Sequence, residues 1–312
     1  MVSTSSINKC GVKNLALVIS NVVKKFGEKT AVDGISFTME NPGVFGLLGT
    51  NGAGKTTTIR MILGILEKDS GTIQWNGKPV TRENVKFGYL PEERGLYPKA
   101  KVGEQLLYFA KLRGLTAKAA KNSMEQWCER LGVTEYINSV AEHLSKGNQQ
   151  KIQFISALIH DPELIILDEP LSGLDPINAD LFRGVINELA SKQKFIIMSS
   201  HQMHLVEEYC NDILILKNGK TLLKGNLNEI KRGYGRTNLS IKCEADIKNL
   251  VEQAGINIVS ADESGYELKI KSEEQANEIL KNIIDNGISV LKFEIREPSL
   301  HEIFVEKVGG AE

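Results

Sequence analysis

Gly49-Thr-Asn-Gly-Ala-Gly-Lys-Thr56 is the segment that decides the fold, because it fits the pattern GxxxxGK[ST] of a phosphate-binding loop. Glycine is needed there so that backbone N–H groups can turn inward and approach phosphate oxygens, which a Cβ atom would obstruct. The apolar run Val44–Leu48 predicts a strand just before the loop. Apolar residues at helical spacing predict a helix over residues 56–66 just after it. A strand, a glycine turn and a helix in succession favour a nucleotide-binding α/β fold.

The loop residues predict how a nucleoside triphosphate and its metal ion are held. The loop enters the N-terminus of the predicted helix, whose partial positive charge attracts anions. Lys55 can reach the β- and γ-phosphates, and the Thr56 hydroxyl can ligate Mg²⁺. ATP and Mg²⁺ are therefore the expected cofactors. The predicted cofactor-binding residues of this segment are Gly49, Asn51, Gly52, Ala53, Gly54, Lys55, Thr56 and Thr57.

A predicted strand that ends in two acids supplies the next candidates. Leu164-Ile-Ile-Leu-Asp-Glu169 is an apolar run followed by adjacent carboxylates. Asp168 is placed to orient Mg²⁺ or its water shell, since carboxylate oxygen suits a hard cation. Glu169 is the better candidate to polarise the attacking water as the general base. Taken alone, adjacent acids after a strand are usually part of a solvated loop, and it is the phosphate-binding loop that favours the catalytic interpretation.

Composition and charge limit the classes of partner. The 312-residue chain has 38 Lys and Arg against 39 Asp and Glu, a net charge of −1, which gives no electrostatic reason to expect nucleic acid. Residues 1–14 lack the apolar core of a secretion signal and are expected to form a flexible segment. No stretch approaches the ~18 uninterrupted apolar residues of a membrane helix, so another chain would supply any span. The four cysteines, Cys10, Cys128, Cys210 and Cys243, have no CxxC spacing, so a zinc site is not expected.

The pattern over residues 15–232 alternates between strands and helices. From about residue 100 to residue 160 the spacing of apolar residues is helical, which predicts a helical insert. Three later runs are fully apolar, namely Leu164–Leu167, Phe195–Met198 and Ile213–Leu216. Fully apolar runs that alternate with helices indicate buried parallel strands. We expect a single nucleotide-binding domain over residues 15–232.

A second, smaller domain is predicted over residues 236–312. The boundary falls near Gly233–Arg236, beyond which the apolar spacing changes to the alternation of strands. The predicted order of elements, βαββαβ, is that of a split-βαβ, ferredoxin-like α+β unit. Ser299 and Glu302 then have the spacing of a capping box at the start of a last helix.

Further motifs give the chain a specific family resemblance. Leu144-Ser-Lys-Gly-Asn-Gln-Gln150 resembles the signature motif of ATP-binding cassette proteins, Ser172-Gly-Leu-Asp175 resembles their D-loop, and Ser199-Ser-His201 resembles their switch histidine. Phe26 stands where the family has an aromatic residue. The motifs occur in the family's order and cover residues 15–230, so chance agreement is negligible. The resemblance implies a P-loop NTPase cassette with a parallel-sheet core, an antiparallel β subdomain and a helical insert.

The resemblance also implies roles for these residues. Phe26 would stack on adenine, and His201 would contact the γ-phosphate and help hold Glu169 and the attacking water. Ser145 and the Gly147 backbone amide would donate to the γ-phosphate of the opposite subunit from a helix N-terminus. Two copies of the chain, or one copy and a related ATPase, would then sandwich two MgATP, and closure of the dimer would assemble the site and expel water.

The sequence departs from the family at the position of a glutamine that follows a short strand. Gly88-Tyr-Leu-Pro-Glu92 places a glutamate there, which can still supply an oxygen to Mg²⁺ or its water but adds negative charge beside the γ-phosphate. Lys146 and Asn148 also replace the residues commonest in the signature. The predicted metal ligands are Thr56, Asp168 and Glu92. Asp175, in the D-loop, is carried over as a further nucleotide-binding residue.

Three stretches narrow the resemblance to a bacterial subfamily of exporter-type ATPases with a small C-terminal domain. They are Gly88–Tyr97, Leu144–Asn148 and Arg296–Phe304. The subfamily is associated with efflux of sodium, antimicrobials or other small molecules through a separately encoded permease. This implies an ATP hydrolase that is peripheral to the cell membrane on its cytoplasmic side.

Two alternatives stay open within the family. The ATPase of an importer shares all the core motifs. ATPases of DNA repair and chromosome organisation need long coiled-coil arms and are disfavoured, because the sequence has no sustained heptad repeat. ATPases of translation carry two cassettes in one chain and are disfavoured, because this sequence has one P-loop and one signature.

Overall fold

The structure, a computed structural model, describes residues 17–81, 83–93 and 95–309, apart from the side chains of residues 308 and 309. The predicted flexible segment 1–14 lies outside the described residues. The chain divides into two compact units, residues 1–224 and 225–312. The chain leaves the larger sheet at this point, near the end of β10 (Lys220–Asn226). The following helix, α7 (Leu227–Tyr234), therefore belongs to the second unit, whereas the sequence pattern places the boundary after it.

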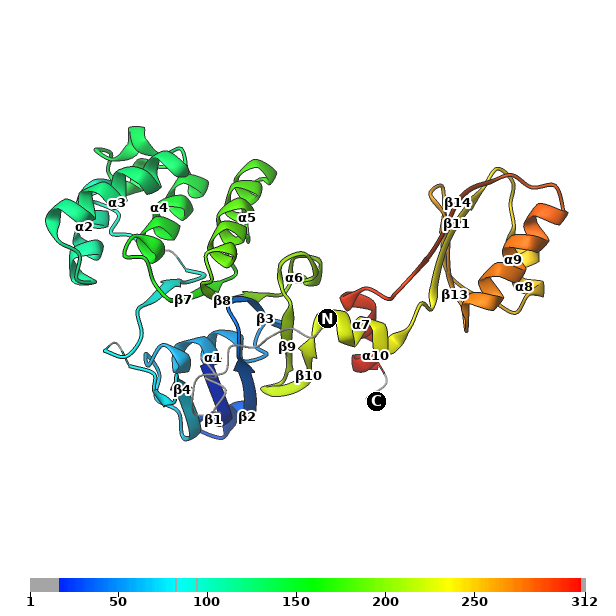
Figure 1. The fold of residues 1–312 in the computed structure, drawn as a ribbon, viewed down its shortest axis with the longest axis horizontal. Helices are drawn as coiled ribbons and strands as arrows, with labels where there is room; N and C mark the ends of the chain where they lie inside the picture. Colours follow the sequence, from blue (N-terminus) through cyan, green and yellow to red (C-terminus); the bar gives the residue numbers. More distant parts are fainter. Residues whose placement is uncertain (1–16, 82, 94, 310–312) are drawn as a thin grey trace, which may run out of the picture. The chain divides into compact units, whose positions relative to one another are not determined.

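A six-stranded sheet forms the centre of the first unit (Figure 1). Besides β10 its strands are β3 (Gly43–Gly49), β6 (Phe87–Leu90), β7 (Leu164–Asp168), β8 (Phe195–Ser200) and β9 (Asp212–Lys217). They lie in the order β10-β9-β3-β8-β7-β6, and the pairs β3–β8, β3–β9, β6–β7 and β7–β8 are parallel. Parallel strands are covered on both faces, which explains why the apolar run of β7 is buried throughout. The predicted parallel-sheet core is confirmed.

A second, antiparallel sheet completes the β structure of this unit. Its strands are β1 (Leu17–Phe26), β2 (Lys29–Met39), β4 (Ser70–Trp75) and β5 (Lys78–Pro79), in the order β2-β1-β4-β5. One hydrophobic cluster joins side chains of both sheets. Within it the rings of Phe37 and Phe45 stack with their centroids 4.6 Å apart. The two sheets therefore share a single core.

The helix after the phosphate-binding loop, α1 (Lys55–Ile62), is shorter than predicted. It starts one residue before the predicted range 56–66 and ends at Ile62, because Gly64 takes a left-handed conformation with φ of 64°. Leu66 still packs against the core beyond the helix end. Ile59, in the middle of the helix, is fully buried, which fixes α1 against the sheets.

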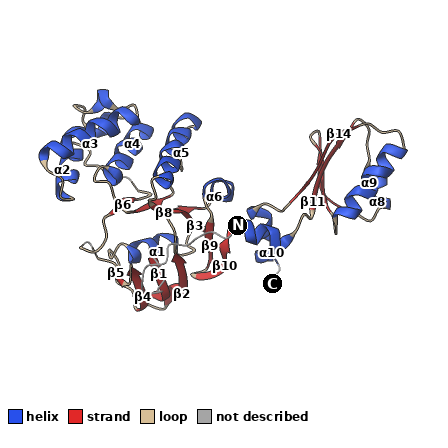
Figure 2. Ribbon diagram, in the orientation of Figure 1, coloured by secondary structure: helices blue, strands red, loops and turns tan. Residues whose placement is uncertain are grey.

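Helices gather on the side of the larger sheet that is opposite to α1 and the antiparallel sheet (Figure 2). They are α2 (Val102–Leu112), α3 (Ala117–Arg130), α4 (Lys146–Leu158), α5 (Pro176–Ser191) and α6 (Met203–Tyr209). The first three make up the predicted helical insert, with short 3-10 turns at Thr134–Tyr136 and Ala141–His143. Phe154 of α4 stacks on Phe182 of α5 at 4.3 Å between ring centroids, and both rings are fully buried. This contact holds the insert to the rest of the unit.

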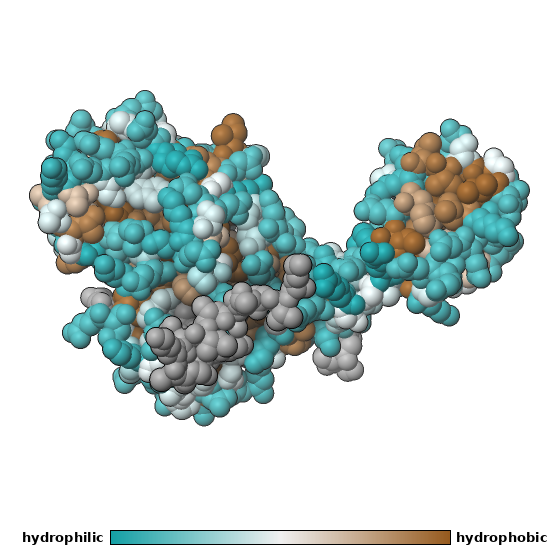
Figure 3. Space-filling view, in the orientation of Figure 1, coloured by the Kyte–Doolittle hydropathy of each residue, from teal (hydrophilic) through white to brown (hydrophobic). Residues whose placement is uncertain are grey.

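The second unit has the predicted ferredoxin-like order. Its elements after α7 are β11 (Asn238–Cys243), α8 (Lys248–Gln253), β12 (Asn257–Asp262), β13 (Gly265–Lys269), α9 (Glu273–Asp285), β14 (Val290–Arg296) and α10 (Leu300–Gly309). The sheet order is β12-β13-β11-β14 with antiparallel pairs, and the core lies between the sheet and α8 and α9. Figure 3 shows a largely hydrophilic surface that also carries apolar patches.

The predicted capping box at the start of α10 is confirmed. The Glu302 backbone N–H donates to Ser299 Oγ at 3.2 Å, and the Ser299 N–H donates to Glu302 Oε2 at 2.6 Å. Arg296 also binds this carboxylate at 3.0 Å. Burial opposes ionisation, but Arg296 and Ser299 lower the pKa of Glu302 to about 2.

Among the described residues, no helix is both long and apolar enough to cross a bilayer.

Candidate active site

The phosphate-binding loop lies where the central strand β3 meets α1. Two of its glycines are required by close contacts as well as by conformation. Gly49 has φ of 150°, and a Cβ there would lie 2.5 Å from the Leu216 carbonyl oxygen. Gly54 has φ of 106°, and its Cβ would lie 2.7 Å from the Ala31 carbonyl oxygen. Any larger residue at either position would push the loop away from the strands that hold it.

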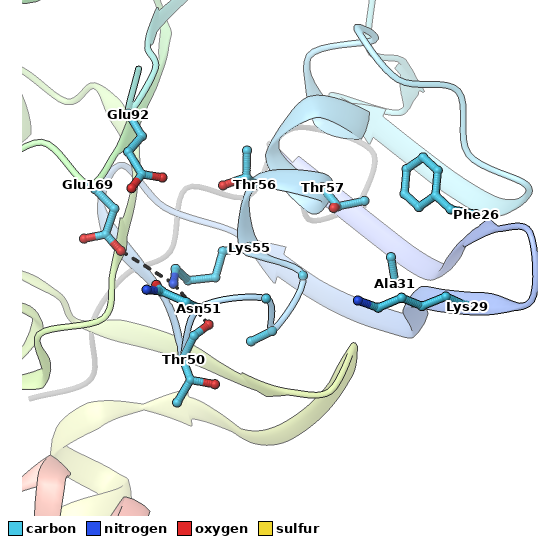
Figure 4. Close-up of a pocket in the computed structure, with 13 residues that line it drawn as sticks. Phe26, Lys29, Ala31, Thr50, Asn51, Lys55, Thr56, Thr57, Glu92 and Glu169 are labelled. Atoms are coloured by element: carbon cyan, nitrogen blue, oxygen red, sulfur yellow. Dashed lines mark hydrogen bonds and ion pairs between the residues drawn. The ribbon is translucent and has the colours of Figure 1, made fainter. Parts of the chain in front are cut away.

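A pocket of about 390 Å³ opens above this loop (Figure 4). That volume falls within the ordinary range of small-molecule sites. Figure 4 shows Glu92 and Glu169 on one side of Lys55 and the Phe26 ring on the other. Phe26 is 51% exposed, so one face of its ring is open to a ligand. The lining residues are Phe26, Lys29, Ala31, Thr50, Asn51, Gly52, Ala53, Gly54, Lys55, Thr56, Thr57, Glu92 and Glu169.

The ammonium group of Lys55 is held inside the pocket by oxygen atoms. Its Nζ donates to the Gly49 carbonyl at 2.8 Å and to the Thr50 carbonyl at 3.4 Å, and it lies 3.5 Å from Glu169 Oε1. Lys55 is only 7% exposed, so its charge is compensated by these partners instead of water. A phosphate that enters the loop would compete with Glu169 for this ammonium.

Glu169 directly follows β7 and takes an uncommon backbone conformation, with φ of 51°. Its side chain is 6% exposed and points into the pocket, where Oε2 lies 2.9 Å from His201 Nδ1. The same carboxylate therefore contacts Lys55 and His201 through its two oxygens. Sequence reasoning placed Glu169 and His201 together, and the structure brings them into direct contact.

Asp168 ends β7 and is 1% exposed. Its Oδ1 accepts a hydrogen bond from Ser199 Oγ at 2.5 Å. Its Oδ2 is buried with no hydrogen-bond partner in the described part of the chain. An unsatisfied buried carboxylate oxygen is costly, which makes this atom a candidate cation ligand.

Glu92 lies two residues beyond β6, in a loop held by the helical insert. Gln153, a buried residue of α4, donates from Nε2 to the Pro91 carbonyl at 3.3 Å and to the Glu93 carbonyl at 2.9 Å. Gln150, one turn earlier in α4, donates to the Pro170 carbonyl at 2.9 Å. Helix α4 therefore holds two loops by hydrogen bonds, the loop that carries Glu92 and the loop that follows Glu169.

The predicted signature and D-loop residues lie elsewhere. Ser145 and Asp175 are exposed helix caps, which accept hydrogen bonds from the backbone N–H groups of Asn148 and Asn178. Gly147 sits beside Asn178, since a Cβ on Gly147 would lie 3.1 Å from its Nδ2. The hydrogen bonds that Asp175 accepts from the backbone and side chain of Asn178 keep the pKa of Asp175 below its usual value. Of the described residues that line the pocket, none belongs to this signature and D-loop surface.

Comparison with known proteins shows the family. A family model described as ABC transporter matches residues 32–172, and one described as ATP-binding protein DrrA1-3-like, C-terminal domain, matches residues 225–308. The ABC transporter ATP-binding protein YhaQ of Bacillus subtilis (strain 168) is 48% identical over 295 residues, which are 94% of this chain and 99% of that protein. The chain belongs to the ABC transporter ATP-binding proteins. As a member of this family it is an ATPase.

Other relatives of this ABC transporter ATP-binding protein also span both units. The linearmycin resistance ATP-binding protein LnrL of Bacillus subtilis (strain 168) is 33% identical, covering 94% of this chain and 98% of that protein. The bacitracin transport ATP-binding protein BcrA of Bacillus licheniformis is 32% identical, covering 93% and 96%. A solved ATP-binding subunit of an ABC transporter is 30% identical with a TM-score of 0.65, covering 70% of this chain and 93% of that one. The predicted family and cassette fold are confirmed.

Sequence reasoning missed three kinds of contact in this site. Lys29 and Ala31 of β2 line the pocket beside Phe26, although no motif marks them. Gln153 holds the loop of Glu92 from 60 residues away in the chain. Ser199 touches both acids, and its position two residues before His201 on a strand beside β7 was the one available signal.

Proposed function

We propose that this ATPase is the energy-supplying subunit of an efflux transporter, that it works as a dimer around two MgATP, and that it drives a separately encoded membrane permease from the cytoplasmic side of the cell membrane. One observation carries the catalytic part. The phosphate-binding loop, Lys55 and Glu169 converge on one pocket, while the exposed Ser145 and Asp175 and the half-buried Gly147 lie outside it.

The triphosphate would be bound by the loop and its lysine. Lys55 would exchange the Glu169 carboxylate for the β- and γ-phosphates, and the backbone N–H groups around Gly52 and Gly54 would surround them. Phe26 offers an exposed ring face on which adenine would stack. The remaining contacts of the phosphates would come from Gly49, Asn51, Ala53, Thr56 and Thr57, which belong to the same loop and helix start.

The residues around Asp168 fit a hard cation. Asp168 Oδ2 is an unpartnered buried oxygen, and Thr56 and Glu92 line the adjoining pocket. Among the described residues, no three His, Cys, Asp or Glu side chains gather to hold a metal by themselves. Mg²⁺ is commonly held by one or two protein oxygens together with substrate phosphates, so this arrangement suits it. When bound, Mg²⁺ would neutralise charge that develops on the β- and γ-phosphate oxygens.

Glu169 is the proposed general base and His201 its partner. The Nδ1–H of His201 would donate to Glu169 at the observed 2.9 Å, which would orient the carboxylate toward the attacking water. The left-handed backbone of Glu169 supports this role, because strained conformations concentrate at functional sites.

A second copy would complete each site. Ser145 caps the start of α4 and is exposed, and Gly147 lies in the first turn of this helix. The partial positive charge of the helix N-terminus would attract a phosphate that another copy holds. Asp175 lies on the same surface, next to Gly147 through Asn178. Closure of the dimer would exclude water and make hydrolysis depend on the paired state.

Complementation between two inactive variants tests the shared site. Lys55→Ala and Ser145→Arg each remove one half of the same composite site, so each homodimer should be inactive. A mixed dimer would retain one intact site and recover up to about half of the parent activity. Equal inactivity of the mixed and single-variant dimers would contradict the proposal. Light scattering of Glu169→Gln with MgATP should show the paired state directly.

Export is favoured over import by the relatives that span both units. Two of them are named for resistance to linearmycin and for transport of bacitracin, and they match the C-terminal unit as well as the cassette. Reconstitution with the cognate permease in vesicles tests the direction. ATP on the side of the ATPase should drive solute away from that side, and movement toward it would favour the importer.

A further inference from the structure

Ser199 forms hydrogen bonds with both Asp168 and Glu169. It is the fifth residue of β8 and is fully buried. In the parallel sheet it is the register partner of Asp168 on one side and of Leu47 on the other. This position brings its hydroxyl to the end of β7, where the chain leaves the sheet for the pocket.

The direction of both Ser199 hydrogen bonds is fixed by chemistry. The Glu169 backbone N–H can only donate, so Ser199 Oγ accepts from it at 3.0 Å. The single hydroxyl proton of Ser199 is then left for Asp168 Oδ1 at 2.5 Å. Both bonds are buried, and removal of the hydroxyl would leave a buried N–H and a carboxylate oxygen without partners.

Each bond constrains one acid. The bond to Asp168 occupies Oδ1 and leaves Oδ2 as the oxygen without a partner within the described structure. The bond to the Glu169 amide holds a residue whose φ of 51° is costly for a non-glycine side chain. That backbone conformation aims the Glu169 carboxylate at Lys55 and His201.

We propose that Ser199 is a positioning residue that sets the metal-binding oxygen of Asp168 and the general base Glu169 at the same time. The inference rests on the proposed roles of those two acids. Its hydroxyl bonds to the Glu169 amide and the Asp168 carboxylate and acts through these two groups. Loss of a hydrogen bond that orients a metal-ligating carboxylate typically lowers metal affinity or activity about 10- to 100-fold.

Three variants test this role. Ser199→Ala should raise the Mg²⁺ concentration for half-maximal activity and weaken Mn²⁺ binding to the ATP-loaded protein, measured by electron paramagnetic resonance, each by about 10-fold or more. It should also lower kcat at saturating Mg²⁺, with ATP affinity in EDTA unchanged. Ser199→Thr keeps the hydroxyl and should restore both metal binding and kcat. Ser200→Ala removes a neighbouring buried hydroxyl that bonds only to Gln202 in the described structure, and should match the parent.

The outcomes separate this inference from the proposed function. Parent-like Mn²⁺ binding and kcat in Ser199→Ala would overturn it, as would an equal loss of metal-free ATP binding, which indicates general damage. If Asp168→Asn and Glu169→Gln also behave like the parent, the proposed function fails instead. Should Ser199→Ala not fold, Ser199→Cys keeps a side chain there with a much weaker donor, and normal metal affinity in that variant would refute the role.

Discussion

Replacement of Glu169 by Gln should tighten ATP binding even though it stops turnover. Glu169 pairs with Lys55 at 3.5 Å, and both side chains are nearly buried. ATP must take Lys55 away from this carboxylate. The Gln variant has no such charge pair to break, and it also removes a negative group that would face the γ-phosphate.

The distance gives the size of the effect. Two unit charges 3.5 Å apart attract by about 5 kcal/mol at an effective dielectric constant of about 20. The desolvation of both charges offsets much of this attraction, so we expect a net effect on the order of 1–2 kcal/mol. That corresponds to roughly 5- to 30-fold in ATP affinity.

Calorimetric titration with ATP in EDTA measures this affinity without metal or hydrolysis. Glu92→Gln is the matched control, because it removes a carboxylate from the same pocket and leaves the Lys55–Glu169 pair intact. The reasoning is refuted if Glu169→Gln binds ATP no more tightly than the parent, or if Glu92→Gln gains as much. With Mg²⁺ present, Glu169→Gln should lose about 10²- to 10⁴-fold in kcat. Turnover at the parent rate would show that Glu169 is not the base.

Three further predictions concern residues that support the site. Gln153→Leu leaves the Pro91 and Glu93 carbonyls without their donor and should lower the free energy of unfolding by about 1–3 kcal/mol in urea titrations; no change would show that solvent replaces the bonds. Gly88→Ala places a Cβ 2.1 Å from the Ala157 carbonyl oxygen, so thermal unfolding should reveal a loss of at least about 1–3 kcal/mol, and a stable variant would mean that β6 shifts freely from α4. Burial lowers the pKa of His160, so the neutral ring contributes stability above the unfolded pKa of about 6.5 that is lost as pH falls below that value and through the lower folded pKa. The urea midpoint of the parent should therefore drop more between pH 7.5 and 5.5 than that of His160→Gln, and equal drops would contradict the assignment.

Local sequence was sufficient where one residue type has a single physical use. The glycines of the phosphate-binding loop are needed for positive φ and close backbone contact, and the structure has both at Gly49 and Gly54. The spacing of Ser299 and Glu302 predicted a capping box because both partners lie within one turn. The helical insert and the buried parallel strands followed from periodicity alone.

Contacts between distant segments could not be predicted in the same way. The bond from Ser199 to Asp168 depends on the register of β8 against β7, which the sequence does not specify. Gln153 meets the loop of Glu92 across 60 residues. The end of α1 was misjudged because the apolar spacing continues to Leu66 although the helix stops before Gly64. His160, which belongs to no motif, is buried and bonded to the carbonyl of Phe87, 73 residues away in the chain.

Helix α4 connects the proposed contact with a second copy to the proposed nucleotide pocket of its own chain. It begins at Ser145, offered to a neighbouring copy, and its Gln150 and Gln153 hold the loops beside its own nucleotide pocket. A shift of either loop when ATP binds would therefore also reorient the serine that is presented to the other copy. In a dimer, occupancy of one pocket would alter the affinity of the other without contact between the two nucleotides, and ATP binding should be cooperative with a Hill coefficient above one.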